Sequence, residues 1–78
     1  MLIIGNWWSG TAGVRQATDV LQSYAPADNR LLMTTDQEGG LVRHLQGPGF
    51  DTMPTAVDQG AMSTDALRQS AAVWGSQL

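Results

Sequence analysis

The sequence predicts an α/β fold in which strand, helix, strand, loop and helix follow one another along 78 residues. Two observations lead to this prediction. Apolar runs without charge, at residues 2–4 and 31–35, are typical of parallel strands that are buried on both faces. Apolar residues also recur at the spacing of one helix face, once between these runs and once near the end of the chain.

The first predicted strand, residues 2–4, leads into a loop and then a helix. Residues 6–13 are rich in Gly, Ser and Thr, so we expect a loop there, with Ser9 or Thr11 available to cap the helix. The helix should end before Pro26, whose ring disfavours a helical conformation in the preceding residue. Its apolar face is expected to consist of Val14, Ala17, Leu21 and Tyr24.

A polar turn then separates this helix from the second predicted strand, residues 31–35. Residues 2–36 therefore make one β-α-β unit, with a crossover long enough to join parallel strands. Residues 41–45 are predicted to be a short extended segment. Residues 46–54 hold two prolines and two glycines and are predicted to be a loop. Its Gly-Pro-Gly sequence at 47–49 lacks the Lys and the Ser or Thr of a phosphate-binding loop and indicates a turn.

The last element is predicted to be a helix that Ser63 or Thr64 caps, with Asp65 in the first turn, where the helix dipole favours a negative charge. Its apolar stripe, at i, i+4, i+7 and i+11, is Leu67, Ala71, Trp74 and Leu78. No helix stop signal follows, and the first strand has no lead-in. We therefore expect the chain to be a piece of a larger fold.

Composition excludes several classes of function. The net charge is −3 and only four residues are Lys or Arg, so a basic surface for nucleic acid or anionic lipid is not expected. The chain has no cysteine, and therefore no disulfide or thiolate metal site. No apolar run approaches the roughly 18 residues of a membrane span. No signal peptide is visible, and the sequence leaves the compartment open.

The most informative segment is Asp36-Gln37-Glu38-Gly39-Gly40, which directly follows the second predicted strand. In parallel α/β folds, ligands bind at the carboxyl ends of strands. Two carboxylates at this position are therefore candidates for binding or chemistry. The two glycines can adopt positive φ angles, and we expect them to serve mainly the conformation of the loop.

The residues alone leave the roles of these carboxylates open. Asp36 could accept hydrogen bonds from a ligand, or its side chain could form a capping Asx turn after the strand. Asp36 and Glu38 could be paired as the acid and nucleophile of a glycosidase. We favour a different role for Glu38, in which it braces the loop by accepting backbone N–H groups or by pairing with Arg43.

The aromatic residues and the one histidine also have two interpretations. Trp7 and Trp8 could stack on a sugar ring, but large aromatic side chains more often belong to a core or an interface, and Trp74 lies in the predicted helix stripe. His44 is expected to form structural hydrogen bonds rather than to carry protons.

The stretch of residues 31–45, with Asp-Gln-Glu-Gly-Gly at its centre, is followed by Gly49-Phe50-Asp51-Thr52-Met53-Pro54. This sequence resembles the N-terminal barrel domain of glycoside hydrolase family 3, most of all its bacterial β-N-acetylhexosaminidases. That family shows an apolar strand ending in Asp-Gln-Glu-Gly-Gly or Asp-His-Glu-Gly-Gly, a Val-x-x-Leu segment, then Gly-Phe-Thr and a proline. Residues 2–6 are similar to its preceding strand, so the resemblance covers essentially residues 1–78.

The resemblance implies that residues 1–78 are part of a (β/α)₈ TIM barrel of roughly 250 residues or more, of which they supply about two βα units. It implies a retaining exo-glycosidase that needs no cofactor or metal and acts on terminal β-linked N-acetylhexosamine. The carbohydrate partner would be an N-acetylglucosamine-containing glycan, such as one derived from peptidoglycan. The family's nucleophilic Asp lies on a late strand, and its acid/base His lies in a Lys-His-Phe-Pro-Gly-His loop. This chain contains neither group, so on its own it is expected to be inactive.

By the same resemblance, Asp36 binds hydroxyl groups of the sugar at the cleaved end. The residues expected to support the site are Glu38, Gly39, Gly40, Arg43 and His44. The family often has Arg where this chain has Leu41, so any role of that Arg is absent here or passes to Arg43 or His44.

Two other functions remain possible from the sequence. One is a family 3 hydrolase of the β-glucosidase type. The other is a complete small acidic α/β module that binds a ligand or a divalent cation through Asp36 and Glu38 without catalysis.

Overall fold

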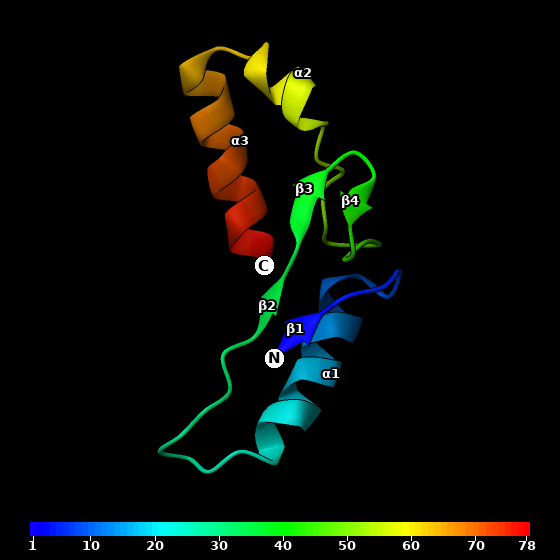
Figure 1. Cartoon of the computed structure of the whole chain (residues 1–78), viewed down its shortest axis with the longest axis vertical. Helices are drawn as coiled ribbons and strands as arrows, with labels where there is room; N and C mark the ends of the chain where they lie inside the picture. The colour runs from blue at the N-terminus through cyan, green and yellow to red at the C-terminus, as the bar shows by residue number, and fades with distance from the viewer.

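The computed structural model describes residues 1–78 as two short strand pairs with three helices, extending over 44 × 24 × 18 Å. Figure 1 shows α1 beside β1 at one end of the molecule and α2 with α3 at the other. The elements are β1 (Leu2–Ile3), α1 (Gly10–Ser23), β2 (Thr34–Thr35), β3 (Gln37–Gly39), β4 (Val42–Arg43), α2 (Ala56–Gly60) and α3 (Thr64–Gln77).

Strands β1 and β2 form a parallel pair, which confirms the predicted β-α-β unit. Ile3 lies opposite Thr35, and the Thr35 hydroxyl donates a hydrogen bond to the Ile3 carbonyl oxygen at 2.9 Å. Both strands are shorter than expected: each has two residues that pair as a strand. Ahead of β2, the Gln22 side chain bonds both backbone groups of Leu31, with its Nε2 at 2.7 Å from the carbonyl oxygen and its Oε1 at 3.0 Å from the nitrogen.

Helix α1 begins at Gly10, so residues 10–13 belong to the helix and not to the loop that was expected at residues 6–13. Ser9 is the N-cap, but its side chain makes no capping hydrogen bond. Carbonyl oxygens of the later loop take that role, because Gly10 N–H donates to Gln46 at 2.9 Å and Thr11 N–H donates to Pro48 at 2.9 Å. The helix ends at Ser23, ahead of Pro26 as predicted. Tyr24 lies beyond it and is exposed, so it is not part of the apolar face.

The core is small and lies between α1 and the strands. Its buried hydrophobic residues are Ile3, Val14 and Leu45, and Trp7, Met33 and Phe50 pack against them. Leu45 reaches this position because it forms a parallel bridge with Trp7. In this bridge, Trp7 N–H donates to the His44 carbonyl oxygen, and Gln46 N–H donates to the Trp7 carbonyl oxygen.

Residues 1–78 cover only one face of the parallel pair, so the predicted burial on both faces is not observed within this chain. Ile3 is buried, whereas its neighbours Leu2 and Ile4 are exposed. Burial also alternates strictly along residues 32–38, with the even-numbered positions exposed. Successive side chains of an extended chain point to opposite faces, and residues 1–78 provide a helix layer for only one of them.

After β2 the chain forms an antiparallel hairpin of β3 and β4, which the sequence did not predict. Gln37 lies opposite Arg43, and the register is irregular between Gln37 and Gly39. Strand β4 agrees with the extended segment expected at residues 41–45. The loop that follows contains the predicted turn, closed by a hydrogen bond from Phe50 N–H to the Gly47 carbonyl oxygen at 3.1 Å.

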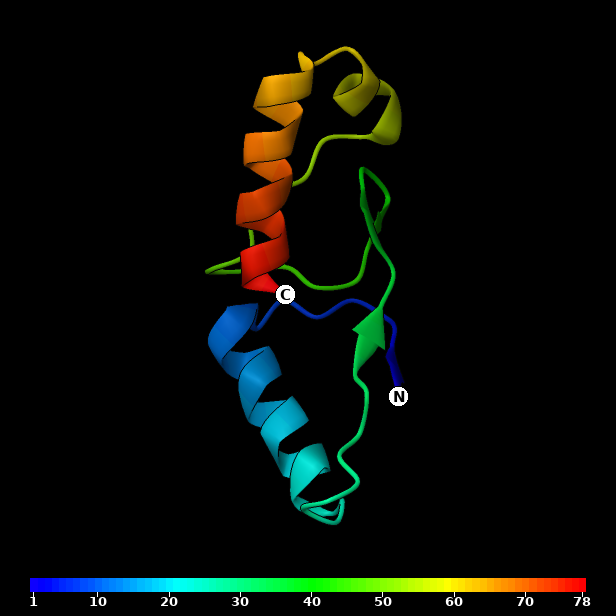
Figure 2. The same cartoon turned by 90° about the vertical axis from the view of Figure 1, so that its left-hand side faces the viewer.

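Helix α2 was not predicted, and Thr55 caps it by accepting a hydrogen bond from Asp58 N–H at 3.2 Å. Helix α3 was predicted, and its Ser63 cap is confirmed by a hydrogen bond from Ala66 N–H at 3.2 Å. Figure 2 shows α3 and α1 following one another along the same side of the molecule. None of the α3 residues is buried, so its apolar stripe lacks a partner layer. None of the helices combines the length and the hydropathy needed to cross a membrane.

Candidate functional site

Asp36 lies between β2 and β3, directly after the carboxyl end of a strand in the parallel pair. Its side chain is exposed and takes part in none of the side-chain hydrogen bonds or ion pairs of the structure. The alternative in which Asp36 forms a capping Asx turn is therefore not observed. Its carboxylate is available to a ligand.

The neighbours of Asp36 hold it in place from both sides. Thr35 is partly buried and bonds to Ile3 in β1, and Gln37 is partly buried in the hairpin. Asp36 between them is exposed, as expected for the opposite face of an extended segment. The backbone therefore directs this carboxylate away from α1 and the core.

Glu38 is exposed on the same face as Asp36, two positions along the chain. The prediction that it braces the loop is wrong, because its carboxylate neither accepts a backbone N–H nor pairs with Arg43. The one ion pair of the structure joins Asp65 and Arg68, 3.9 Å apart in α3. Glu38 contributes only its backbone carbonyl, which accepts a hydrogen bond from Gln59 Nε2 at 3.3 Å.

Gln37 braces the loop instead, and the sequence interpretation missed it. Its Nε2 donates to the Leu45 carbonyl oxygen at 2.8 Å, and its Oε1 accepts from Leu45 N–H at 3.1 Å. A polar residue on the core side of a strand must find hydrogen-bond partners, because burying an unbonded amide is costly. Gln37 lies two and four positions after Thr35 and Met33, on the same face of the extended segment. This spacing was the signal that could have identified it.

Gly39 and Gly40 have φ angles of +90° and +57°, which confirms their conformational role. A Cβ on Gly39 would lie 2.2 Å from the Pro54 carbonyl oxygen, and one on Gly40 would lie 2.8 Å from Thr55 Cγ2. Gly40 N–H also donates to the Met53 carbonyl oxygen at 3.2 Å. In this structure the glycines therefore allow the chain to pack closely on its own later segment.

His44 is a structural hydrogen-bonder, as predicted. Its Nδ1 lies 2.7 Å from the Gly5 carbonyl oxygen and 3.2 Å from the Gly5 nitrogen. In any one tautomer, Nδ1 cannot both donate to the carbonyl oxygen and accept from the backbone N–H. The shorter contact favours donation to the carbonyl oxygen.

Arg43 is partly buried and forms no ion pair. It lines a small pocket of about 110 Å³ together with Trp8, Phe50 and Asp51 among others. Leu41, where the resembling family often has Arg, is fully exposed in the turn between β3 and β4. Arg43 therefore remains available to a ligand, while the Nδ1 atom of His44 is already bonded.

The two adjacent tryptophans have different surroundings. Trp7 packs against the core, and its Nε1 donates to the Ile4 carbonyl oxygen at 3.0 Å, so the core interpretation is confirmed for it. Trp8 is 66% exposed and lines the small pocket, so it is not part of the core of residues 1–78, and its place in an interface stays a prediction. Stacking of Trp8 on a sugar stays a prediction.

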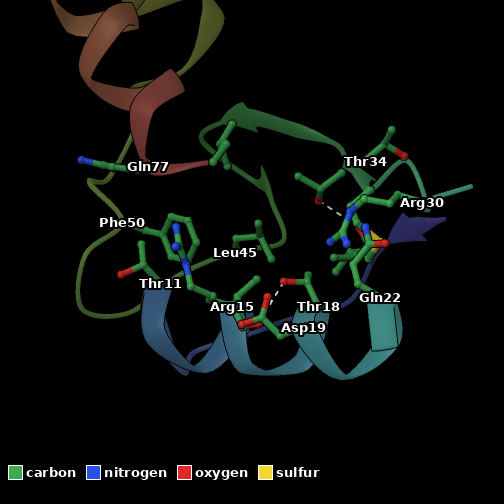
Figure 3. A pocket seen from close by; sticks show the side chains of 15 residues that line it. Thr11, Arg15, Thr18, Asp19, Gln22, Arg30, Thr34, Leu45, Phe50 and Gln77 are labelled. Carbon is green, nitrogen blue, oxygen red and sulfur yellow. Dashed lines mark hydrogen bonds between the residues drawn. The ribbon is translucent and has the colours of Figure 1, made fainter. Parts of the chain in front are cut away.

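The largest cavity, of about 570 Å³, lies elsewhere (Figure 3). Arg15, Asp19 and Gln22 of α1 line one wall, and the core residues Ile3 and Leu45 also contribute. Figure 3 shows that this space lies between α1 and the strands. Asp36 and Glu38 do not line it, so it is incompletely filled space behind the sheet rather than part of the candidate site.

The structure brings together no group of three or more His, Cys, Asp or Glu side chains that could hold a metal ion. Asp36 and Glu38 therefore have no third His, Cys, Asp or Glu side chain with which to form such a group. Oxygen-binding cations such as Ca²⁺ usually take six or more ligands. Nothing in the geometry supports the alternative of a cation-binding module.

The chain is similar to part of a solved structure, the β-N-acetylhexosaminidase from Beutenbergia cavernae, with 41% sequence identity and a TM-score of 0.79. The match covers 99% of this chain and 24% of that chain, so these residues span about a quarter of the relative's length. No protein-family model matches the sequence. The search of curated proteins also found no match. The predicted resemblance to a bacterial β-N-acetylhexosaminidase is confirmed.

Proposed function

We propose that this chain forms about a quarter of a family 3 glycoside hydrolase that releases terminal β-linked N-acetylhexosamine, with Asp36 binding the sugar. The observation that carries the proposal is the free carboxylate of Asp36 after a parallel strand, in a chain 41% identical to a β-N-acetylhexosaminidase. An ionised carboxylate can accept hydrogen bonds from two neighbouring hydroxyl groups, and bonds to a charged acceptor are stronger than neutral ones.

The fold supports the placement of this group in a (β/α)₈ barrel. In such barrels the loops after the strands build the active site, and Asp36 belongs to such a loop. On the exposed side of the parallel pair lie Leu2 of β1, Ile4 directly after it and Leu32 two residues ahead of β2. Branched apolar side chains of this kind fill the interior of a TM barrel in layers. The remaining strands would cover this face, and Asp36 would lie at its upper rim.

The chemistry divides between this segment and the remainder of the barrel. In a retaining mechanism one carboxylate attacks the anomeric carbon while an acid protonates the leaving oxygen. Those two groups would come from other segments. Asp36 would hold the sugar hydroxyls while the ring distorts, Gln37 would fix the loop, and Gly39 and Gly40 would let the loop pack on residues 53–55.

A reconstituted barrel tests the proposal. In it, residues 1–78 replace the matching quarter of the Beutenbergia cavernae enzyme. We expect this chimera to hydrolyse 4-nitrophenyl N-acetyl-β-glucosaminide and to lose most of that activity with Asp36→Ala. A chimera that unfolds cooperatively but has no activity, or whose activity is insensitive to Asp36→Ala, would contradict the proposal.

The same chimera separates the two alternative functions from this one. A β-glucosidase type would show a higher kcat/KM for the 4-nitrophenyl β-glucoside than for the N-acetylated substrate. The cation-binding alternative is tested on the chain itself by a calcium titration followed by tryptophan fluorescence. Saturable quenching that Asp36→Asn abolishes would favour that alternative.

A further inference from the structure

We propose that Gln37 is a positioning residue for Asp36, acting through a two-bond clamp on the backbone of Leu45. This inference rests on the proposed function, because it assigns Gln37 a role in sugar binding through its neighbour. It concerns the polar residue on the core side of the motif, whose carboxamide nitrogen and oxygen each form a hydrogen bond within the chain.

The clamp completes a continuous ladder across three segments. In the parallel bridge, Trp7 uses its N–H and C=O groups to bond His44 and Gln46, at 2.8 and 2.7 Å. In such a bridge the N–H and C=O groups of the intervening Leu45 point the opposite way. The Gln37 carboxamide binds both of them, at 3.1 and 2.8 Å. It thus occupies the place of a peptide group in a neighbouring strand.

Asp36 is the residue immediately beside this anchor. On its other side, Thr35 is fixed by its hydroxyl bond to Ile3 and by the pairing of β1 with β2. The Asp36 carboxylate has no bond of its own to orient it, so its position depends on the backbone of these two neighbours. Loss of the Gln37 clamp would free one side of Asp36 while leaving its charge and chemistry unchanged.

Burial makes the clamp hard to replace. Leu45 is 5% exposed, so its N–H and C=O groups have little access to water if the Gln37 amide is removed. Gln37 also pairs with Arg43 next to the irregularity in the hairpin register between Gln37 and Gly39. Without the clamp, the segment can relax by shifting Gln37, and Asp36 moves with it.

The chain contains a matched control. Gln22 makes the same two-bond clamp on Leu31, with its Nε2 at 2.7 Å from the carbonyl oxygen and its Oε1 at 3.0 Å from the nitrogen. That clamp lies ahead of β2, away from the motif. Gln22→Met and Gln37→Met each remove one clamp and keep the side-chain volume similar. The first variant frees the backbone of Leu31, and the second frees the backbone of Leu45.

The experiment measures kcat/KM of the reconstituted barrel for 4-nitrophenyl N-acetyl-β-glucosaminide. We expect Gln37→Met to lower kcat/KM about tenfold, because displacing a binding group by a fraction of an ångström weakens its contacts in the transition state. Gln22→Met should stay within about twofold of the unmodified barrel. Gln37→His, which keeps one donor and one acceptor, should recover part of the loss.

A double-mutant cycle distinguishes positioning from general stabilisation. In an Asp36→Ala background, Gln37→Met should change kcat/KM by less than about twofold, since the group it positions is gone. A persisting tenfold effect, or equal effects of Gln37→Met and Gln22→Met, would overturn the positioning role and leave Asp36 as the sugar contact. If Asp36→Ala itself had no effect, the proposed function would fail, and the positioning role with it. If Gln37→Met does not fold, the same cycle is run with Gln37→His. This variant should lower kcat/KM by less than tenfold when Asp36 is present, and should have no effect on kcat/KM in the Asp36→Ala protein.

Discussion

The Nδ1 atom of His44 lies 2.7 Å from the carbonyl oxygen of Gly5, which precedes it by 39 residues. The contact joins the segment after β1 to the segment after β4, next to the bridge between Trp7 and Leu45. A backbone carbonyl bonded to Nδ1 sets both the tautomer and the orientation of the ring. His44 thus helps to close the fold around the core.

The first prediction concerns this contact. His44→Ala should lower the free energy of unfolding of the reconstituted barrel by about 0.5–1.5 kcal/mol, the net value of one hydrogen bond. His44→Asn should restore part of that loss, because the amide nitrogen can still donate to Gly5. Urea unfolding measures both effects. A general acid or base contributes about 10²–10⁴ to the rate, so a hundredfold fall of kcat in His44→Ala would contradict the structural assignment.

The second prediction concerns Gly39. Gly39→Ala should destabilise the barrel by more than about 2 kcal/mol, because φ is +90° and the new Cβ would lie 2.2 Å from the Pro54 carbonyl oxygen. The measurement is the denaturant midpoint at constant m-value.

Gly75→Ala is the matched control for that substitution. Gly75 lies inside α3, and a Cβ there would meet nothing within 4 Å. Replacing a helical glycine by alanine in open space should stabilise by about 0.5–1 kcal/mol. Equal effects of the two substitutions would show that the conformation of Gly39 does not constrain the loop.

The third prediction concerns Asp36 in the reconstituted barrel. Asp36→Ala should lower kcat/KM by about one to two orders of magnitude, because losing a hydrogen bond to a charged group costs roughly 1.5–3 kcal/mol. Part of the loss should appear in kcat, since sugar contacts strengthen as the ring approaches the oxocarbenium-like transition state. Asp36→Asn should be milder, because the amide oxygen still accepts one bond.

Trapping of the covalent intermediate separates binding from chemistry at Asp36. A slow substrate with a good leaving group should still label the nucleophile in Asp36→Ala, as detected by mass spectrometry. Complete loss of labelling with the fold intact would make Asp36 a direct participant in the reaction. Unchanged kcat/KM would remove it from the site.

The fourth prediction is that the 78-residue chain alone does not hydrolyse 4-nitrophenyl N-acetyl-β-glucosaminide. The nucleophile and the acid that the resemblance implies are absent from it, and these groups supply much of the rate enhancement. The release of 4-nitrophenol by the purified chain is compared with buffer. Turnover that Asp36→Ala or Glu38→Ala abolishes would revive the interpretation of these two carboxylates as a catalytic pair.

The fifth prediction is that the isolated chain is molten or self-associates. Its core has three buried hydrophobic side chains, whereas Leu2 of β1 and two residues that flank the strands, Ile4 and Leu32, are exposed. We expect binding of a hydrophobic dye and an apparent mass that rises with concentration. Leu32→Lys should reduce the association, because this side chain is 77% exposed and a lysine replaces exposed apolar surface by a charge. A monomer with a sharp cooperative melt would contradict the prediction.

The sequence alone determined the features that depend on local pattern. The two extended segments of the β-α-β unit, the two long helices, the Ser63 cap and the conformational role of Gly39 and Gly40 each follow from residues within a few positions of one another. Glycine identity and apolar spacing have direct consequences for backbone conformation, so these elements could be predicted without knowing their neighbours. The motif after β2 also located the candidate site and named Asp36 within it.

The tertiary structure alone decided how that motif is held. Glu38 was expected to brace the loop, yet Gln37 does so by bonding Leu45, eight residues away. The cap of α1 likewise comes from Gln46 and Pro48 rather than from Ser9. A buried backbone N–H or C=O group can be bonded by a side-chain amide or a backbone carbonyl from any point in the chain. The spacing of residues in the sequence therefore does not show which partner bonds it. Burial of the strands was decided in the same way, because an apolar run shows which side chains avoid water but not which layer covers them.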